Sequence, residues 1–298
     1  MNAIIFPGQG SQYQGMGKSL YDNFAEARDF FSYIDKCAGF SISGMCFEGK
    51  PEELKRTYYQ QMAILEVSLV SYEIFKTKKI KFNFLSGLSL GEYTCLYPAG
   101  VLDLKNLIHL VKERATAMED ASVANPSVMF AVLGLDKETL KTLANDNGFY
   151  VANLNSSQQI AVSLAKDNRQ KVKEFLESKG AKVIELDVGG GFHSRFMEPA
   201  KKHLAKVLET IQFNNANIPI ISNFTAKAHT DSSEIKRNLL EQLTSTVLWS
   251  DCVQLMANHK VDTFFEVGPS KVLRGLIRKI NPVLKVINIE KKEDLDSV

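Results

Sequence analysis

The sequence predicts an α/β protein in which a small second domain is inserted into a larger one. Apolar strand runs alternate with helical spacing over most of the chain, which indicates a mostly parallel sheet covered by helices. The middle of the chain has its own β-α-β-β-α-β order, typical of a ferredoxin-like domain. With 298 residues, of which 45% are hydrophobic, the chain can form a large core. We expect the large domain in residues 1–125 and 197–298 and the insert in residues 126–196.

The first part of the large domain is expected to contain two strands and several helices. The first strand is AIIF, residues 3–6, which a Pro-Gly pair ends before the loop Gly8-Gln9-Gly10. Apolar spacing is mostly helical over residues 19–75, and KFNFL, residues 81–85, then alternates as a strand does. A helix follows in EYTCLYPAG, where Pro98 is expected to end it.

The inserted domain is expected to contain four strands and two helices. The strands are SVMFAVLGL, FYVANLN, QQIAVSL and AKVIELDV, and the helices are DKETLKTLANDNG and KDNRQKVKEFLESKG. Asp136 and Asp167 are placed to cap the two helices. Gly148 and Gly180 are placed to end them. After the insert, IPIISN and DTFFEVG are expected as buried strands, and the tail EKKEDLDSV is expected to fray.

Composition and charge exclude several classes of function. The 36 Lys and Arg residues nearly balance the 34 Asp and Glu residues, and the net charge of +2 argues against nucleic acid as a partner. The four cysteines are scattered without metal-binding spacing, which argues against structural zinc and a disulfide framework and favours a reducing cytoplasm. The first residues lack a basic region, and no apolar run approaches the length of a membrane span. We therefore expect a cytoplasmic protein that binds no membrane.

The stretch GLSLGE, residues 87–92, contains a Gly-x-Ser-x-Gly pattern where a strand meets a helix. Such a turn forces the serine backbone into a strained position, and the flanking glycines remove Cβ atoms that would clash. The hydroxyl of Ser89 then projects outward, and free N–H groups at the start of the next helix suit a developing oxyanion. The pattern predicts a nucleophile, although an ordinary glycine turn with a capping serine explains it equally well.

A serine nucleophile needs a base, and the chain has five histidines. Four of them lie in helical or hydrophilic surroundings that suit the surface. His193 stands in GGGFHSRF, where three successive glycines let one segment pass close to another and Phe192 supplies an apolar wall. Ordering three glycines is costly, so we interpret His193 as the base. The alternative is that this segment is a flexible hinge between the domains.

Arg114 lies on the apolar side of a helix that Asp103 caps. The apolar stripe runs through Leu104, Leu107, Ile108, Val111, Ala115 and Met118. A guanidinium on such a stripe must find an anion, because an unpaired buried charge costs roughly 3 to 5 kcal/mol. The anion is either a carboxylate of the chain itself or part of a ligand.

Six motifs resemble, in order and spacing, the malonyl-CoA:acyl-carrier-protein transacylase family. They are FPGQGSQ, GLSLGE, VKERATAM, GGGFHSRFM, SNFTAK and FFEVGPSKVLRGL, and the resemblance covers residues 4–280. It implies an α/β-hydrolase-like large subdomain with an inserted ferredoxin-like small subdomain. It also implies an acyltransferase that moves malonyl from malonyl-CoA to the phosphopantetheine thiol of a holo acyl carrier protein, for fatty-acid or polyketide synthesis.

The resemblance assigns a role to each candidate residue. Ser89 is implied to carry malonyl as an ester, and His193 to activate it. The backbone N–H groups of Gln9 and Leu90 are implied to form the oxyanion hole. Arg114 is implied to hold the malonyl carboxylate in a bidentate pair, which lysine cannot reproduce.

Further positions are implied to complete the site. The other substrate-binding residues are Met118, Phe192 and Asn155. The main-chain carbonyl of Leu248, just before the only tryptophan, is implied to orient the histidine. On the residues alone, Asp187 is an alternative partner that would complete a Ser-His-Asp set.

The expected enzyme is a monomer that binds no metal and no resident cofactor. Two other functions stay open from the sequence. One is a hydrolase that discharges acyl groups to water, which the retained Arg114 argues against. The other is a non-catalytic scaffold that binds the carrier protein, which the intact set of Ser89, His193 and Arg114 argues against.

Overall fold

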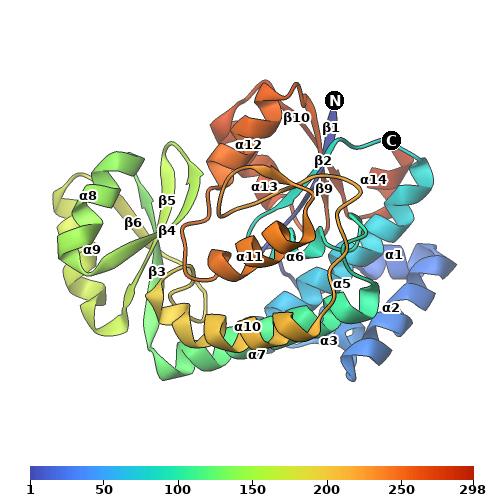
Figure 1. Ribbon diagram of the computed structural model, residues 1–298, viewed down its shortest axis with the longest axis horizontal. Helices are drawn as coiled ribbons and strands as arrows, with labels where there is room; N and C mark the ends of the chain where they lie inside the picture. The colour runs from blue at the N-terminus through green and yellow to red at the C-terminus, as the bar shows by residue number, and fades with distance from the viewer.

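The computed structural model describes residues 1–298, apart from the side chain of Asn145. It contains one six-stranded and one four-stranded sheet, and the smaller sheet with its helices forms a lobe beside the larger part (Figure 1). The strands are β1 (Asn2–Phe6), β2 (Phe84–Gly87), β3 (Ser127–Leu133), β4 (Phe149–Ser156), β5 (Gln159–Ala165), β6 (Lys182–Glu185), β7 (Ile220–Ile221), β8 (Ala228–His229), β9 (Thr263–Val267) and β10 (Lys285–Ile289). The helices are α1 (Lys18–Asn23), α2 (Ala25–Ala38), α3 (Ile42–Glu48), α4 (Pro51–Leu54), α5 (Thr57–Phe75), α6 (Leu90–Thr94), α7 (Leu104–Ala124), α8 (Lys137–Asn147), α9 (Arg169–Ser178), α10 (Glu198–Thr210), α11 (Ser232–Gln242), α12 (Trp249–Asn258), α13 (Val272–Ile280) and α14 (Lys292–Asp296).

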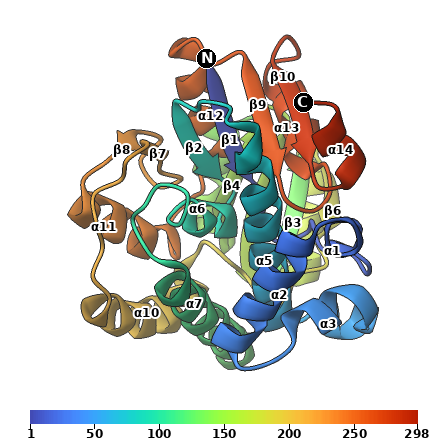
Figure 2. The ribbon, with the colours of Figure 1, turned by 90° about the vertical axis from the view of Figure 1, so that its right-hand side faces the viewer.

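The large sheet has the strand order β10-β9-β1-β2-β7-β8 and is parallel except for the β7–β8 hairpin. Successive residues of β1 point to opposite faces, as in any strand. Ile4 and Phe6 pack into the same buried cluster as residues of α5 and α7, whereas Ala3 and Ile5 pack with residues of α12 and α13. Helices therefore cover both faces of the sheet, and α7 and α10 lie side by side below it (Figure 2).

The small sheet has the order β4-β5-β3-β6, and its three strand pairs are all antiparallel. Helices α8 and α9 cover its outer face, and their apolar residues share a buried cluster with the strands (Figure 1). The β-α-β-β-α-β order and the α/β fold class are confirmed. The domain bounds at residues 126 and 196 stay a prediction.

Two local predictions are wrong. Asp136 caps α8 by accepting from the N–H groups of Glu138 and Thr139, but Asp167 caps no helix, because it lies in a 3-10 turn and α9 begins at Arg169. The tail does not fray as expected, because Leu295 of α14 is buried in the main core. None of the helices in the described chain is long and apolar enough to cross a membrane.

Candidate active site

The site lies where the carboxyl ends of β1 and β2 meet. Phe6 and Gly87 are partners at the ends of these parallel strands. The loop after β1 therefore lies beside the turn after β2, which is the edge where ligands bind in open α/β sheets. Contact here is close: a Cβ atom on Gly91 would lie 2.0 Å from the carbonyl oxygen of Phe6, and one on Gly8 would lie 2.3 Å from that of Leu88.

Ser89 has the strained backbone that the glycine pattern predicts. Its φ is 54° and its ψ is −100°, in a region that residues other than glycine rarely adopt. Two side chains stabilise this backbone conformation. The Ser89 N–H donates to Asn223 Oδ1 at 2.7 Å, and the Ser89 carbonyl accepts from Gln242 Nε2 at 3.2 Å. The serine stands just before α6, half-buried, at the mouth of the buried site.

Two backbone N–H groups near Ser89 have no hydrogen-bond acceptor among the described residues. They belong to Gln9, in the loop after β1, and to Leu90, the first residue of α6. The first N–H groups of a helix have no partner within the helix, so Leu90 is free to donate to a ligand. The side chain of Gln9 donates to Gln60 Oε1 at 2.8 Å, which ties the loop to α5. Both groups are suitable oxyanion donors.

Arg114 on α7 is fully buried beside the serine. Its Nη2 donates to Ser89 Oγ at 3.0 Å, and its Nη1 donates to Gln61 Oε1. Its guanidinium also lies over the ring of Tyr93, 4.6 Å from the ring centre. Among the described residues no carboxylate lies within 4.0 Å of it, and its Nε has no partner. Burial lowers the pKa of Arg114, and the arginine is left without a contacting anion of the chain itself.

His193 is also buried, and its position is set by one main-chain contact. Its Nδ1 lies 2.9 Å from the carbonyl oxygen of Gln242. Because a carbonyl only accepts, Nδ1 carries the proton and Nε2 keeps a free lone pair, as a general base requires. Burial lowers the pKa of His193 to about 4, so the ring is neutral at physiological pH. Among the described residues no hydrogen bond joins it directly to Ser89 Oγ.

Neither the expected partner of His193, the carbonyl of Leu248, nor the alternative, Asp187, forms a hydrogen bond with its ring. The carbonyl of Leu248 accepts from the Cys252 N–H, because Leu248 is the N-cap residue of α12, which begins at Trp249. Asp187 is exposed and pairs with Lys55 at 2.8 Å. The orienting carbonyl belongs instead to Gln242, at the end of α11.

Of the other three expected substrate-binding residues, Met118 and Phe192 lie beside residues of this centre, whereas no hydrogen bond among the described residues joins Asn155 to it. Met118 and Phe192 are buried and belong to the same apolar cluster. The thioether of Met118 accepts from Gln61 Nε2 at 3.5 Å, so it lies next to the residue that holds Arg114. Asn155 on β4 has a buried side-chain oxygen without a partner among the described residues, and no hydrogen bond joins it to Ser89.

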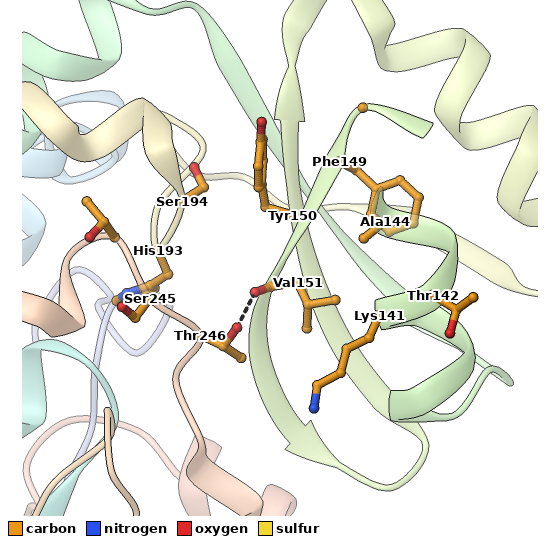
Figure 3. Close-up of a pocket in the computed structure, with 12 residues that line it drawn as sticks. Lys141, Thr142, Ala144, Phe149, Tyr150, Val151, His193, Ser194, Ser245 and Thr246 are labelled. Atoms are coloured by element: carbon orange, nitrogen blue, oxygen red, sulfur yellow. Dashed lines mark hydrogen bonds between the residues drawn. The ribbon is translucent and has the colours of Figure 1, made fainter. Parts of the chain in front are cut away.

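A cleft of about 750 Å³ opens beside His193, between the large part and the small lobe. Figure 3 shows His193 and Ser194 on one side of it and β4 with α8 on the other. The lining mixes polar side chains such as that of Ser194 with apolar ones such as that of Phe149, and Thr246 donates to the carbonyl of Val151 at 2.7 Å across the two parts. His193 lines the cleft, whereas Ser89 and Arg114 do not.

Comparisons with known proteins identify the family. A family model described as an acyl transferase domain matches residues 3–291. The chain belongs to this family. A malonyl CoA-acyl carrier protein transacylase of Bacillus subtilis (strain 168) is 39% identical over 300 residues, which cover 99% of this chain and 95% of the relative. The predictions of family and of an acyltransferase are confirmed.

Solved structures of other members have the same fold. An acyl carrier protein S-malonyltransferase from Vibrio cholerae is 33% identical and has a TM-score of 0.95, with 99% of each chain covered. A malonyl-transacylase in complex with its type II PKS acyl-carrier protein is 30% identical and has a TM-score of 0.94, with 99% of this chain and 98% of that chain covered. The agreement extends over both sheets, so the small lobe is part of the shared fold.

Proposed function

We propose that this acyltransferase transfers malonyl from malonyl-CoA to the phosphopantetheine thiol of a holo acyl carrier protein, through an ester on Ser89. The observation that carries the proposal is Arg114: it is fully buried, contacts no carboxylate of the chain, and lies 3.0 Å from Ser89 Oγ. A single methylene separates the carboxylate of malonyl from its thioester carbon. The group that binds the carboxylate must therefore lie close to the nucleophile, as Arg114 lies close to Ser89 Oγ.

In the first half-reaction, Arg114 holds the malonyl carboxylate while Ser89 Oγ attacks the thioester carbon. The hydrogen bond from Arg114 uses a lone pair of the serine oxygen, so the hydroxyl proton remains free to move to His193 Nε2. The N–H groups of Gln9 and Leu90 stabilise the oxyanion. The carbon–sulfur bond then breaks, and the coenzyme A sulfur leaves with the proton from His193.

In the second half-reaction, the carrier's thiol gives its proton to His193 and attacks the ester carbon. The bond to Ser89 Oγ breaks, and the serine oxygen takes the proton back from His193. Atoms and charges balance over both halves, and the enzyme returns to its starting state. We assign the phosphopantetheine arm to the cleft between the two parts, because His193 lines it.

Incubation with malonyl-CoA and a holo acyl carrier protein tests the function. We expect mass spectrometry to find malonyl on Ser89 and then on the carrier thiol. Net release of free malonate would favour a hydrolase instead, and a chain that forms no adduct would favour a non-catalytic scaffold. The fatty-acid and polyketide pathways use the same transfer, so we leave the pathway open.

The oligomeric state, location and cofactor requirement of the enzyme are also part of the proposed function. We propose that it acts as a monomer in the cytoplasm, with malonyl-CoA as substrate and without a resident cofactor or metal. The buried arginine and the neutral histidine supply the charges and the base that the transfer needs, which supports a reaction without metal. Neither nucleic acid nor a membrane is needed as a partner.

A further inference from the structure

Glu92 is a buried carboxylate to which the proposed mechanism gives no role. It lies on α6, three residues after Ser89, and is 2% exposed. Its Oε2 accepts from the Asn223 N–H at 2.8 Å and from Gln242 Nε2 at 2.7 Å. Among the described residues no basic group lies within ion-pair distance of it. Burying a carboxylate without a basic partner costs free energy. The two residues that donate to Glu92 therefore indicate what its burial achieves.

The two residues that donate to Glu92 also hold the nucleophile and the base. Asn223 accepts from the Ser89 N–H at 2.7 Å and donates to the carbonyl of Gly87 at 2.9 Å, which fixes the strained turn on both sides. Gln242 accepts from His193 Nδ1 at 2.9 Å through its main-chain carbonyl. Glu92 therefore contacts both Asn223, which holds the backbone of Ser89, and Gln242, which orients His193.

The carboxylate also fixes which way the side-chain amide of Gln242 points. An ionised carboxylate accepts hydrogen bonds and donates none, so the NH₂ group of Gln242 must face Glu92. The amide oxygen then faces Arg114, where it lies 3.5 Å from Nη2. A flipped amide would place NH₂ against the guanidinium, donor against donor. Burial raises the pKa of Glu92 to about 7, although its hydrogen bonds and the charge of Arg114 oppose this rise, so the ionised carboxylate fixes the amide at pH values above about 7.

We propose that Glu92 is a positioning residue, which holds His193 through Gln242 and Ser89 through Asn223. It thereby keeps His193 Nε2 and Ser89 Oγ in the relative positions that proton transfer needs. The inference rests on the proposed roles of Ser89 and His193. Substrate binding depends on it less, because Arg114 is also held by Gln61. Loss of Glu92 therefore lowers the rate of Ser89 acylation more than it weakens binding of malonyl-CoA.

Glu92→Gln tests the proposal, because it keeps the size of the side chain and removes its charge. We expect kcat to fall at least about tenfold, within the range that a misplacement of about 1 Å causes. The KM for malonyl-CoA should stay within about twofold, since the carboxylate-binding group is intact. A fluorophosphonate that labels Ser89 gives a second readout: its labelling rate should fall in parallel with kcat.

Glu266→Gln is the matched control. Glu266 on β9 is also fully buried, accepts from two backbone N–H groups and from Asn288 Nδ2, and has a pKa raised to about 7 by burial. It makes no hydrogen bond to Ser89, His193 or Gln242 among the described residues. The control removes a buried carboxylate of the same kind and should still label at the wild-type rate.

Gln242→Met is a second test, which also serves if Glu92→Gln does not fold. It keeps the main-chain carbonyl and removes the amide, so it should slow labelling about as much as Glu92→Gln. In the double variant the two losses should add only in part, because the Gln242–Glu92 contact is common to both variants while Glu92 also holds Asn223. Wild-type labelling rates in folded Glu92→Gln or in Gln242→Met, or an equal loss in Glu266→Gln, would overturn the proposal. Because the fluorophosphonate needs no malonyl group, these results stand apart from the test of malonyl transfer.

Discussion

Arg114→Ala tests the proposed selectivity for malonyl most directly. In the wild-type enzyme the incoming carboxylate meets a buried guanidinium that contacts no acidic side chain. A hydrogen bond to a charged group contributes about 1.5–3 kcal/mol, so a bidentate pair contributes about 3–6 kcal/mol. At about 1.4 kcal/mol per factor of ten, the substitution should lower kcat/KM for malonyl-CoA by about 10²–10⁴.

The effect on acetyl-CoA should have the opposite direction. An acetyl group in the wild-type site leaves the buried guanidinium without its anion, which is a strong penalty for a donor that lacks the expected polar group. Alanine removes that penalty, so the ratio of acetyl to malonyl transfer should rise. Arg114→Lys keeps the charge but not the bidentate geometry, and should fall between alanine and wild type for malonyl.

The assay measures acylation of Ser89 by quenched-flow mass spectrometry with each donor separately. Arg28→Ala is a suitable control, since Arg28 is exposed and donates to the main-chain carbonyl of Tyr21 at 2.9 Å. The control should leave both rates unchanged. An unchanged ranking of malonyl over acetyl in folded Arg114→Ala would refute the account of selectivity.

Four further predictions concern Ser89, His193 and the buried Glu266. Ser89→Ala should abolish the malonyl adduct, and His193→Ala should slow its formation by about 10²–10⁴, both measured by intact-protein mass spectrometry; an adduct on Ser89→Ala would contradict the assignment. The pKa of His193 is lowered from 6.5 to about 4 by burial, so protonation of the base should give a limb of kcat/KM for acylation well below 6.5. The measurement is made in Glu92→Gln, which lacks the buried carboxylate that titrates at about 7; a limb near 6.5 in this variant would be inconsistent with the buried ring. Burial raises the pKa of Glu266 from 4.5 to about 7, so the unfolded chain binds fewer protons than the native protein between these values and stability falls as the pH rises. Glu266→Gln should remove about 3 kcal/mol of that fall, measured by urea unfolding at about pH 5 and about pH 8; an unchanged pH dependence would show that Glu266 does not carry it.

The sequence predicts those parts of the fold that local pattern controls. The alternation of apolar residues and the capping residue Asp136 are properties of neighbouring residues, and the inserted domain follows from them. Strand β10 is not predicted, because KVINI lies at the edge of the sheet and only its last residues are buried. The order of the tail depends on Leu295 packing into a distant core, which no local pattern reveals.

The same distinction separates the predicted and unpredicted parts of the site. Ser89 stands between glycines and Arg114 on an apolar stripe, and each is visible because its own neighbours make it unusual. The contact that orients His193 is a main-chain carbonyl, which every residue has, so its position depends on how the segment after α11 folds. The sequence therefore does not indicate Gln242 as the orienting residue, and the structure does not confirm Leu248. Gln61, which accepts a hydrogen bond from Arg114, lies among the buried residues of α5, and its neighbours in the sequence do not mark it as a site residue.

The neutral amide of Gln242 explains how a buried arginine and a buried glutamate coexist in this site without pairing. Its Nε2 donates to Glu92 at 2.7 Å, and its Oε1 faces Arg114 at 3.5 Å. A direct ion pair at about 4 Å would be worth about 4 kcal/mol at an effective dielectric constant of about 20, and the malonyl carboxylate would have to displace it. With the amide between them, Glu92 lowers the cost of burying the positive charge while the guanidinium stays open. The arrangement therefore keeps Arg114 charged and available, and it makes the substrate the acid that the arginine contacts.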